Sequence, residues 1–320
     1  MRAIGIMGAT AVLSLAACGG GGGGSTAPST PIAATPTPSP PASATPTPTP
    51  VDPASYDIAF DLTRDREFAL FGAEISSVFN GSTYESVDVK LLDLGALAYA
   101  RYVAATQATT ISIFNVASDT YTSPAAQSSN AISYGTPERS LALFKPGPSM
   151  GGLRAELTYT IGATQHVNTA LGAGETRIMD RRFVSGTATV ATDIPASGSA
   201  AYATIASEYG LTAGSRDSYT ALAQSGGFNV DFASRSVTAS IVSAQSQIIG
   251  APVSTITLNF SGDFVGQTSQ IAGTLTTSDG GSGRWAGRVY GPSGRELAVA
   301  FTYVRGAKKV IGTAEATLNR

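Results

Sequence analysis

Hydrophobic residues alternate with polar or small residues through much of the chain beyond Ser199. The alternation is clear at Phe228-Asn229-Val230-Asp231-Phe232, and it recurs around Ile256 to Phe260 and Leu297 to Tyr303. A period of two places one face of a β-strand in a core and the other in water. Glycine-rich breaks such as Asp279-Gly280-Gly281 separate the runs and are typical of hairpin turns. The pattern predicts about eight short antiparallel strands.

These strands could form a sandwich or a closed barrel. A barrel is favoured because closure removes exposed sheet edges, which a protein at a crowded surface must avoid. Within this barrel Trp285 is expected to fill the interior, since large aromatic side chains are common core residues. Tyr290 lies five positions further along and is expected on the opposite face.

The preceding segment, 56–192, alternates less regularly. Strand-like runs occur at Ser86–Leu92, Thr109–Val116, Ser140–Phe144 and Glu156–Ile161, and Phe68–Phe79 is compatible with a short helix or a strand. The predicted fold class is therefore all-β. A smaller β-rich, handle-like domain (56–192) precedes an eight-stranded antiparallel β-barrel (193–320), with Asp193 to Gly198 leading into the first barrel strand.

The N-terminus predicts export and a lipid anchor. Met1-Arg2 is followed by an uncharged, mostly apolar run from Ala3 to Ala17, too short for the ~20 residues of a spanning helix. The run ends in Leu15-Ala16-Ala17-Cys18, which resembles the lipobox of bacterial lipoproteins, and Cys18 is the only cysteine. The resemblance implies a signal peptide over 1–18 and acylation, including palmitate, of Cys18. An ordinary cleaved signal with a free thiol is the alternative.

Residues 19–55 are expected to be a disordered tether. Gly19 to Gly24 are consecutive glycines, and more than half of the 17 prolines fall between Pro28 and Pro53. Such a segment lacks apolar side chains to bury and favours extended polyproline II. Gly19 after the cysteine, rather than aspartate, fits export to the outer membrane by analogy with the enterobacterial sorting rule.

The composition and the short motifs give little indication of nucleic-acid binding, metal binding or catalysis. The chain has 20 basic and 22 acidic residues, so no basic field would attract nucleic acid. His166 is the only histidine, which argues against histidine-based metal sites and suggests a surface side chain. Gly147 to Gly151 matches a nucleophile-elbow string, but proline and glycine crowd it where a strand and helix are needed. We therefore expect no enzyme, no cofactor and no metal.

Arg177, Arg181 and Arg182 form the one charged cluster that suggests a ligand site. Arginine side chains pair well with anions such as a siderophore carboxylate. A solvated strand neutralised in part by Asp180 and Glu175 is the alternative. Several tyrosines of the handle-like segment suggest binding anchors or half-buried strand residues: Tyr84, Tyr99, Tyr102, Tyr121 and Tyr134.

The C-terminal half resembles the β-barrel domain of transferrin-binding protein B and related bacterial surface lipoproteins. The resemblance rests on Pro195 to Tyr202, on Gly227 to Ala233 with Val237, and above all on Gly287 to Leu297, an aromatic-Gly-Pro turn followed by Glu-Leu. It covers roughly Ile194 to Leu318. Leu143 to Pro146 and Leu157 to Thr160 resemble the family's handle region more weakly.

Two positions depart from the family pattern: Val299 and Ala203 stand where glycine is usual. Both concern strand geometry. The resemblance implies a barrel fold and a surface location, with ligand contacts on loops and the handle tip. No known ligand-contacting motif is matched, so the resemblance does not imply transferrin as the ligand.

The predicted function is a lipid-anchored outer-membrane binding protein that faces the cell exterior and captures a protein or an iron- or haem-related cargo without catalysis. Its expected partners are the membrane, through the lipid on Cys18, that cargo, and an outer-membrane transporter or secretion partner. A structural or adhesive envelope lipoprotein without small-molecule cargo is the alternative. A transmembrane channel is disfavoured by short Gly/Ala-rich strands without aromatic girdles.

Overall fold

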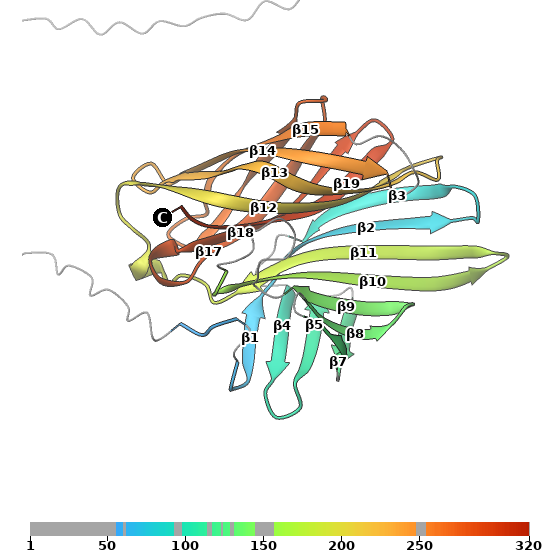
Figure 1. Cartoon of the computed structure of the whole chain (residues 1–320), viewed down its shortest axis with the longest axis horizontal. Helices are drawn as coiled ribbons and strands as arrows, with labels where there is room; N and C mark the ends of the chain where they lie inside the picture. Colours follow the sequence, from blue (N-terminus) through green and yellow to red (C-terminus); the bar gives the residue numbers. More distant parts are fainter. Residues whose placement is uncertain are drawn as a thin grey trace, which may run out of the picture. The chain divides into compact units, whose positions relative to one another are not determined.

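The computed structural model describes residues 56–59, 62–92, 98–113, 117–122, 124–128, 131–144, 157–247 and 254–319. The described residues belong to one compact unit. Within them, regular structure consists of β-strands and short 3-10 turns (Figure 1). The predicted signal peptide with Cys18, the whole predicted tether and the nucleophile-elbow string at 147–151 lie outside the described residues.

The C-terminal half forms a closed barrel of eight antiparallel strands, as the alternation predicts. The 3-10 turn η2 (Ala191–Asp193) leads into it, and η3 (Pro292–Gly294) lies between its sixth and seventh strands. Closure comes from the antiparallel pairing of the first strand with the last, so the sandwich alternative is wrong. The barrel strands are β12 (Ser199–Thr212), β13 (Ser218–Asp231), β14 (Ser236–Gln247), β15 (Ser254–Phe264), β16 (Gln270–Thr277), β17 (Ser282–Tyr290), β18 (Glu296–Arg305) and β19 (Lys308–Leu318).

Aromatic side chains fill the barrel interior. Trp285 is fully buried and makes edge contacts with Phe228 and Phe260, at ring-centroid distances of 6.3 and 6.0 Å. Phe260 also contacts Phe301 at 5.4 Å. Tyr290 belongs to a different cluster, on the outer face of the barrel. The predicted positions of Trp285 and Tyr290 are confirmed.

The preceding segment forms two sheets below the barrel in Figure 1, and we call them together the handle. The larger sheet has the strand order β3-β2-β11-β10-β9-β8-β7, and the smaller sheet has the order β1-β4-β5-β6. The strands of the larger sheet are β2 (Phe71–Phe79), β3 (Tyr84–Leu92), β7 (Pro124–Gln127), β8 (Ala131–Thr136), β9 (Arg139–Phe144), β10 (Thr160–Gly172) and β11 (Glu175–Gly186). Those of the smaller sheet are β1 (Arg66–Ala69), β4 (Ala98–Val103), β5 (Ala108–Ile113) and β6 (Ala117–Tyr121).

The structure decides between the two alternatives for Phe68–Phe79, in favour of strand, and it corrects one predicted strand boundary. Phe68–Phe79 is not a helix: it contributes to β1 and β2, because both faces of this stretch pack against other elements. The strand expected over Glu156–Ile161 begins only at Thr160. The residues just before it turn toward the barrel, where a buried carboxylate binds their backbone.

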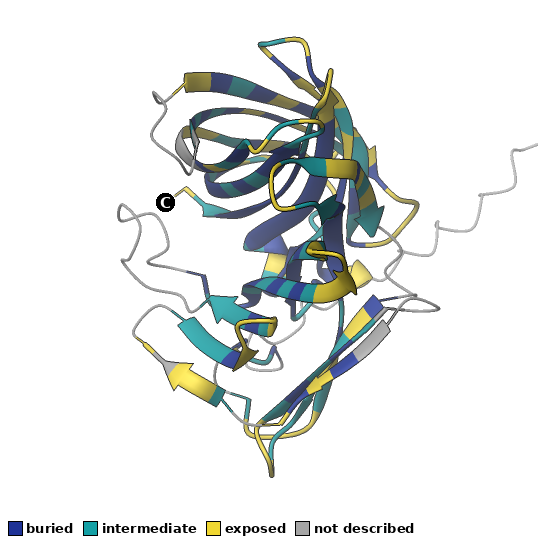
Figure 2. Ribbon diagram, turned by 90° about the vertical axis from the view of Figure 1, so that its right-hand side faces the viewer, coloured by how far each residue is buried: buried dark blue, intermediate teal, exposed yellow. Residues whose placement is uncertain are grey.

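Two apolar layers hold the handle together and fix it to the barrel. One layer joins β2 and β11 to the outer face of β12, β18 and β19, with Phe71, Ile75, Val184, Leu211 and Ile311 buried in it. The other lies between the two handle sheets. Figure 2 shows the buried residues concentrated in the barrel and along the contact with the handle. The handle is therefore positioned by a hydrophobic interface.

Candidate binding regions of the handle and barrel

Glu296 connects the handle to the barrel. It is fully buried at the start of β18. Its carboxylate accepts the backbone N–H groups of Thr158 and Tyr159, at 2.6 and 3.0 Å, and the hydroxyl of Thr160. Burial raises the pKa of Glu296, and these hydrogen bonds oppose that shift. The Glu of the Glu-Leu motif thus holds the strand that starts the handle's central hairpin.

The aromatic-Gly-Pro turn lies at the same junction. Gly291 has φ +70°, and a Cβ there would lie 2.3 Å from the ring of Tyr159. Asp193 accepts the N–H of Ser293 at 2.8 Å and the hydroxyl of Tyr56 at 2.9 Å. The motif therefore needs glycine for both conformation and space. It serves the contact between handle and barrel.

The three arginines of the sequence-predicted ligand site do not converge. Arg181 is 1 % exposed, with its guanidinium donating to Glu74 at 2.7 Å and to Gln165 at 2.9 Å. Arg182 faces the barrel and donates to the hydroxyl of Ser207 at 2.8 Å. Neighbouring strand residues point to opposite faces, so the two guanidiniums are separated by the sheet. Arg177 is exposed near the tip of the β10–β11 hairpin. A single anion site formed by Arg177, Arg181 and Arg182 is therefore wrong.

Arg181 instead belongs to a buried polar network between the handle sheets. Gln165, which accepts from Arg181, donates to Asp119 at 2.8 Å and to the hydroxyl of Tyr121 at 2.9 Å. Asp119 also pairs with Arg139. Since Asp119 and Tyr121 lie on β6, this network connects the smaller sheet to β10 and β11. The buried Arg181 and Asp119 therefore each have a partner of opposite charge.

His166 is half-buried in the middle of β10, although the sequence suggests a surface side chain. Its Nδ1 lies 2.6 Å from a carboxylate oxygen of Asp180 on β11. The hydrogen bond to Asp180 raises the pKa of His166 above its ordinary 6.5, and partial burial opposes the shift. The pair lines a cavity of about 190 Å³ that also touches Arg182 and Tyr209.

This pair predicts a pH dependence of stability. Because the folded pKa of His166 is raised, its stabilising contribution is complete below pH 6.5 and is lost as the pH rises through the folded pKa. We expect the free energy of unfolding in urea to fall by less than about 1 kcal/mol between pH 6 and 8.5. The His166→Asn variant should lack this decrease. The same decrease in that variant would contradict the assignment, and the chain has no other histidine to supply it.

A larger cavity, of about 470 Å³, lies between the two handle sheets. Its walls combine residues of the smaller sheet with residues of β7 to β11, most of them apolar. Among them are Phe68, Tyr102, Ile111, Ile132 and Tyr134. We call it the handle cavity. No short-range sequence pattern indicates it, since it forms between segments far apart in the chain.

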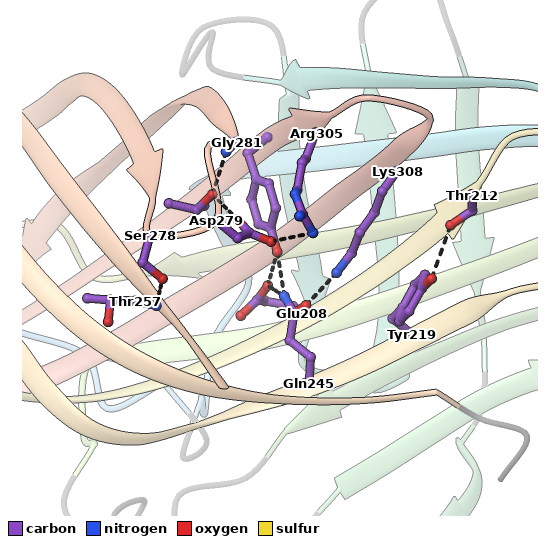
Figure 3. Close-up of polar contacts among 12 residues, drawn as sticks. Glu208, Thr212, Tyr219, Gln245, Thr257, Ser278, Asp279, Gly281, Arg305 and Lys308 are labelled. Atoms are coloured by element: carbon purple, nitrogen blue, oxygen red, sulfur yellow. Dashed lines mark hydrogen bonds and ion pairs between the residues drawn. The ribbon is translucent and has the colours of Figure 1, made fainter. Parts of the chain in front are cut away.

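A cluster of polar side chains joins the barrel strands β12, β14, β18 and β19 (Figure 3). Glu208 is 2 % exposed and accepts from Ser243, from Gln245 at 3.1 Å and from the hydroxyl of Tyr303 at 2.7 Å. The ammonium group of Lys308 donates to the side-chain carbonyl oxygen of Gln245. Burial lowers the pKa of Lys308. The donors around Glu208 all come from barrel strands, so this cluster links those strands to one another.

The handle tyrosines have mixed environments. Tyr121 and Tyr134 are buried core residues in contact with each other, with ring centroids 6.2 Å apart. Tyr84 packs on Phe79, and Tyr102 lines the handle cavity. Tyr99 is the exposed member, at 38 %. Only part of this set is therefore available to a ligand.

Among the described residues, no group of three or more His, Cys, Asp or Glu side chains is placed to hold a metal ion. None of the helices in the described ranges is long and apolar enough to cross a membrane.

Comparison with known proteins identifies the type of β-barrel. Residues 194–317 match the family model described as the C-lobe and N-lobe beta barrels of Tf-binding protein B. No curated protein matches the sequence. The C-terminal domain is thus a β-barrel of the transferrin-binding-protein-B type, and the resemblance predicted from the sequence is confirmed.

Solved structures of similar proteins share little sequence with this chain. A double mutant of transferrin-binding protein B from Haemophilus parasuis is 13 % identical, with a TM-score of 0.44 over 78 % of this chain and 45 % of that one. The isotype 1 protein from Neisseria meningitidis is 11 % identical, with a TM-score of 0.40 over 79 % and 44 %. This chain therefore spans less than half the length of both. The haemoglobin receptor HpuA from Kingella denitrificans is 14 % identical, with a TM-score of 0.38 over 86 % and 94 %.

Proposed function

We propose that this protein is a lipid-anchored binding protein of the outer membrane, facing the cell exterior, that captures a protein or an iron- or haem-related cargo without catalysis. The observation that carries the proposal is the match of residues 194–317 to the barrels of transferrin-binding protein B. The lipobox at Leu15 to Cys18 and the Gly/Pro-rich segment after it support a lipid on Cys18 and a tether. Delivery of the cargo to an outer-membrane transporter belongs to the same proposal.

The handle is the part that we propose contacts the cargo. Its junction with the barrel is fixed by Glu296 and by a buried apolar layer, so the barrel can act as a rigid support. The β10–β11 hairpin projects from the rest of the protein in Figure 1. At its tip, Leu171 is 43 % exposed, and the exposed Arg177 follows a few residues later. Exposed apolar residues beside charges suit a protein partner.

Binding to transferrin and to haemoglobin, measured by biolayer interferometry with the full chain, tests this proposal. We expect one of these probes to bind, and the Leu171→Asp variant to weaken that binding at least ~10-fold, as for a central contact residue. Val265→Asp is the matched control, because Val265 is equally exposed, at 47 %, but lies beyond β15 in the barrel. Equal loss in both variants would contradict a handle-tip site.

An adhesive or structural envelope lipoprotein is the second candidate. The same handle and barrel would then mediate contacts without a soluble cargo. Absence of binding to either probe, together with loss of cell adhesion when the gene is deleted, would favour this candidate.

A further inference from the structure

We propose that the handle cavity binds the alkyl chain of a single-chain lipid with an uncharged polar end, such as a monoacylglycerol. This site is separate from the proposed cargo site, and neither proposal depends on the other. The cavity has about 470 Å³ of space, within the ~300–1,000 Å³ typical of small-molecule sites. An apolar cavity of ~150 Å³ already binds benzene, so this one is large enough for a longer chain.

The chemistry of the lining selects an uncharged ligand. Among the described residues that line the cavity, none is Asp, Glu, Lys, Arg or His. A ligand with carboxylates, such as haem or a siderophore, would find no cation among these described residues to balance its charge. The buried charged side chains nearby already have partners: Arg181 pairs with Glu74, and Asp119 pairs with the exposed Arg139. The lining is thus complementary to methylene groups.

The burial of the lining residues indicates how the ligand would be oriented in the handle cavity. Leu70, Ile111 and Tyr134 are each at most 3 % exposed and lie at the buried side of the cavity. Gln107, between β4 and β5, is exposed, and Tyr102 on β4 is half-buried. The alkyl chain would therefore lie against the buried residues, with its polar end near the Gln107 amide and the Tyr102 hydroxyl.

Calorimetric titration with monoacylglycerols of six, eight and ten carbons tests the proposal. The protein is the mature chain that the lipobox predicts, from residue 18 onward and carrying Cys18→Ser, so that it lacks both the lipid and the apolar run Ala3 to Ala17. We expect the affinity to increase about fourfold for each added methylene until the cavity is filled. Affinity that does not depend on chain length would overturn the proposal.

Cavity-filling variants separate this site from non-specific binding. Ala100 lines the cavity from β4, so Ala100→Phe should reduce the affinity at least tenfold while leaving the melting temperature unchanged or higher. Ala201→Phe adds the same ring at an exposed barrel position and is the control. Should Ala100→Phe fail to fold, Ile132→Trp fills the cavity from the opposite sheet. Undiminished binding in a folded filling variant would overturn the proposal.

Vesicles of phosphatidylethanolamine and phosphatidylglycerol distinguish a free lipid from a bilayer as the source of the chain. We expect no co-sedimentation of the Cys18→Ser protein with them. Co-sedimentation that Ala100→Phe abolishes would support the cavity as an alkyl-chain site and make the bilayer the source. If the Cys18→Ser protein binds vesicles but no monoacylglycerol, and the Ala100→Phe variant binds vesicles equally well, the proposal would be overturned.

Discussion

Replacing Trp285 with alanine is expected to lower the free energy of unfolding by about 3–5 kcal/mol, as for other buried aromatic residues. The indole is fully buried and lies against Phe228 and Phe260, and its N–H donates to the carbonyl of Thr274 at 2.9 Å. Truncation leaves a cavity in the middle of the barrel that the surrounding strands cannot close. Urea unfolding followed by circular dichroism measures the change.

The matched control is Tyr99→Ala, which removes an aromatic ring that is 38 % exposed on β4. We expect it to cost less than about 1 kcal/mol. If the two variants lost equal stability, the barrel interior would not be the main core of the protein.

Replacing Glu296 with alanine is expected to cost about 3 kcal/mol and to expose the segment before β10 to proteolysis. The backbone N–H groups of Thr158 and Tyr159 would lose their acceptor in a buried place, and each such group costs about 1–3 kcal/mol. Glu296→Gln keeps one acceptor oxygen and should lose less. Urea unfolding and the rate of tryptic cleavage, mapped by mass spectrometry, measure the two effects.

Glu67→Ala removes an exposed carboxylate from β1 and is the control. It should leave both the stability and the cleavage pattern unchanged. Glu296→Ala with wild-type cleavage would show that the handle is held by the apolar layer alone, and would remove the role assigned to the Glu-Leu motif.

Much of the barrel can be predicted from the sequence because its signal is local. Each strand alternates apolar and polar residues, so Phe228, Val230 and Phe232 all face inward. The odd spacing of Trp285 and Tyr290 is enough to place them on opposite faces. The number of strands does not dictate closure, because eight antiparallel strands can also form a sandwich. The barrel is favoured because closure removes exposed edges.

The junction and the handle were harder to predict because their contacts are non-local. Glu296 beside Leu297 looks like a surface residue until its partners, more than a hundred residues away, are known. Arg181 and Arg182 suggest one charged site only while their strand is unassigned, since β11 sends them to opposite faces. The handle cavity depends on how two sheets face each other, which no single segment encodes.

The barrel, the junction and the handle have complementary roles. The barrel supplies a rigid support, and the buried Glu296 carboxylate and an apolar layer fix the handle. The β10–β11 hairpin runs alongside the barrel and projects beyond it at one end (Figure 1). In the proposed function, the predicted lipid at Cys18 and the tether after it would keep this support at the cell surface.

Protease shaving of intact cells, with immunoblotting for the folded domain beyond the tether, tests whether the protein faces the cell exterior. We expect protease added to intact cells to release this domain while a periplasmic marker stays protected. Protection in intact cells that is lost when the outer membrane is opened would place the protein in the periplasm and contradict the surface-receptor proposal.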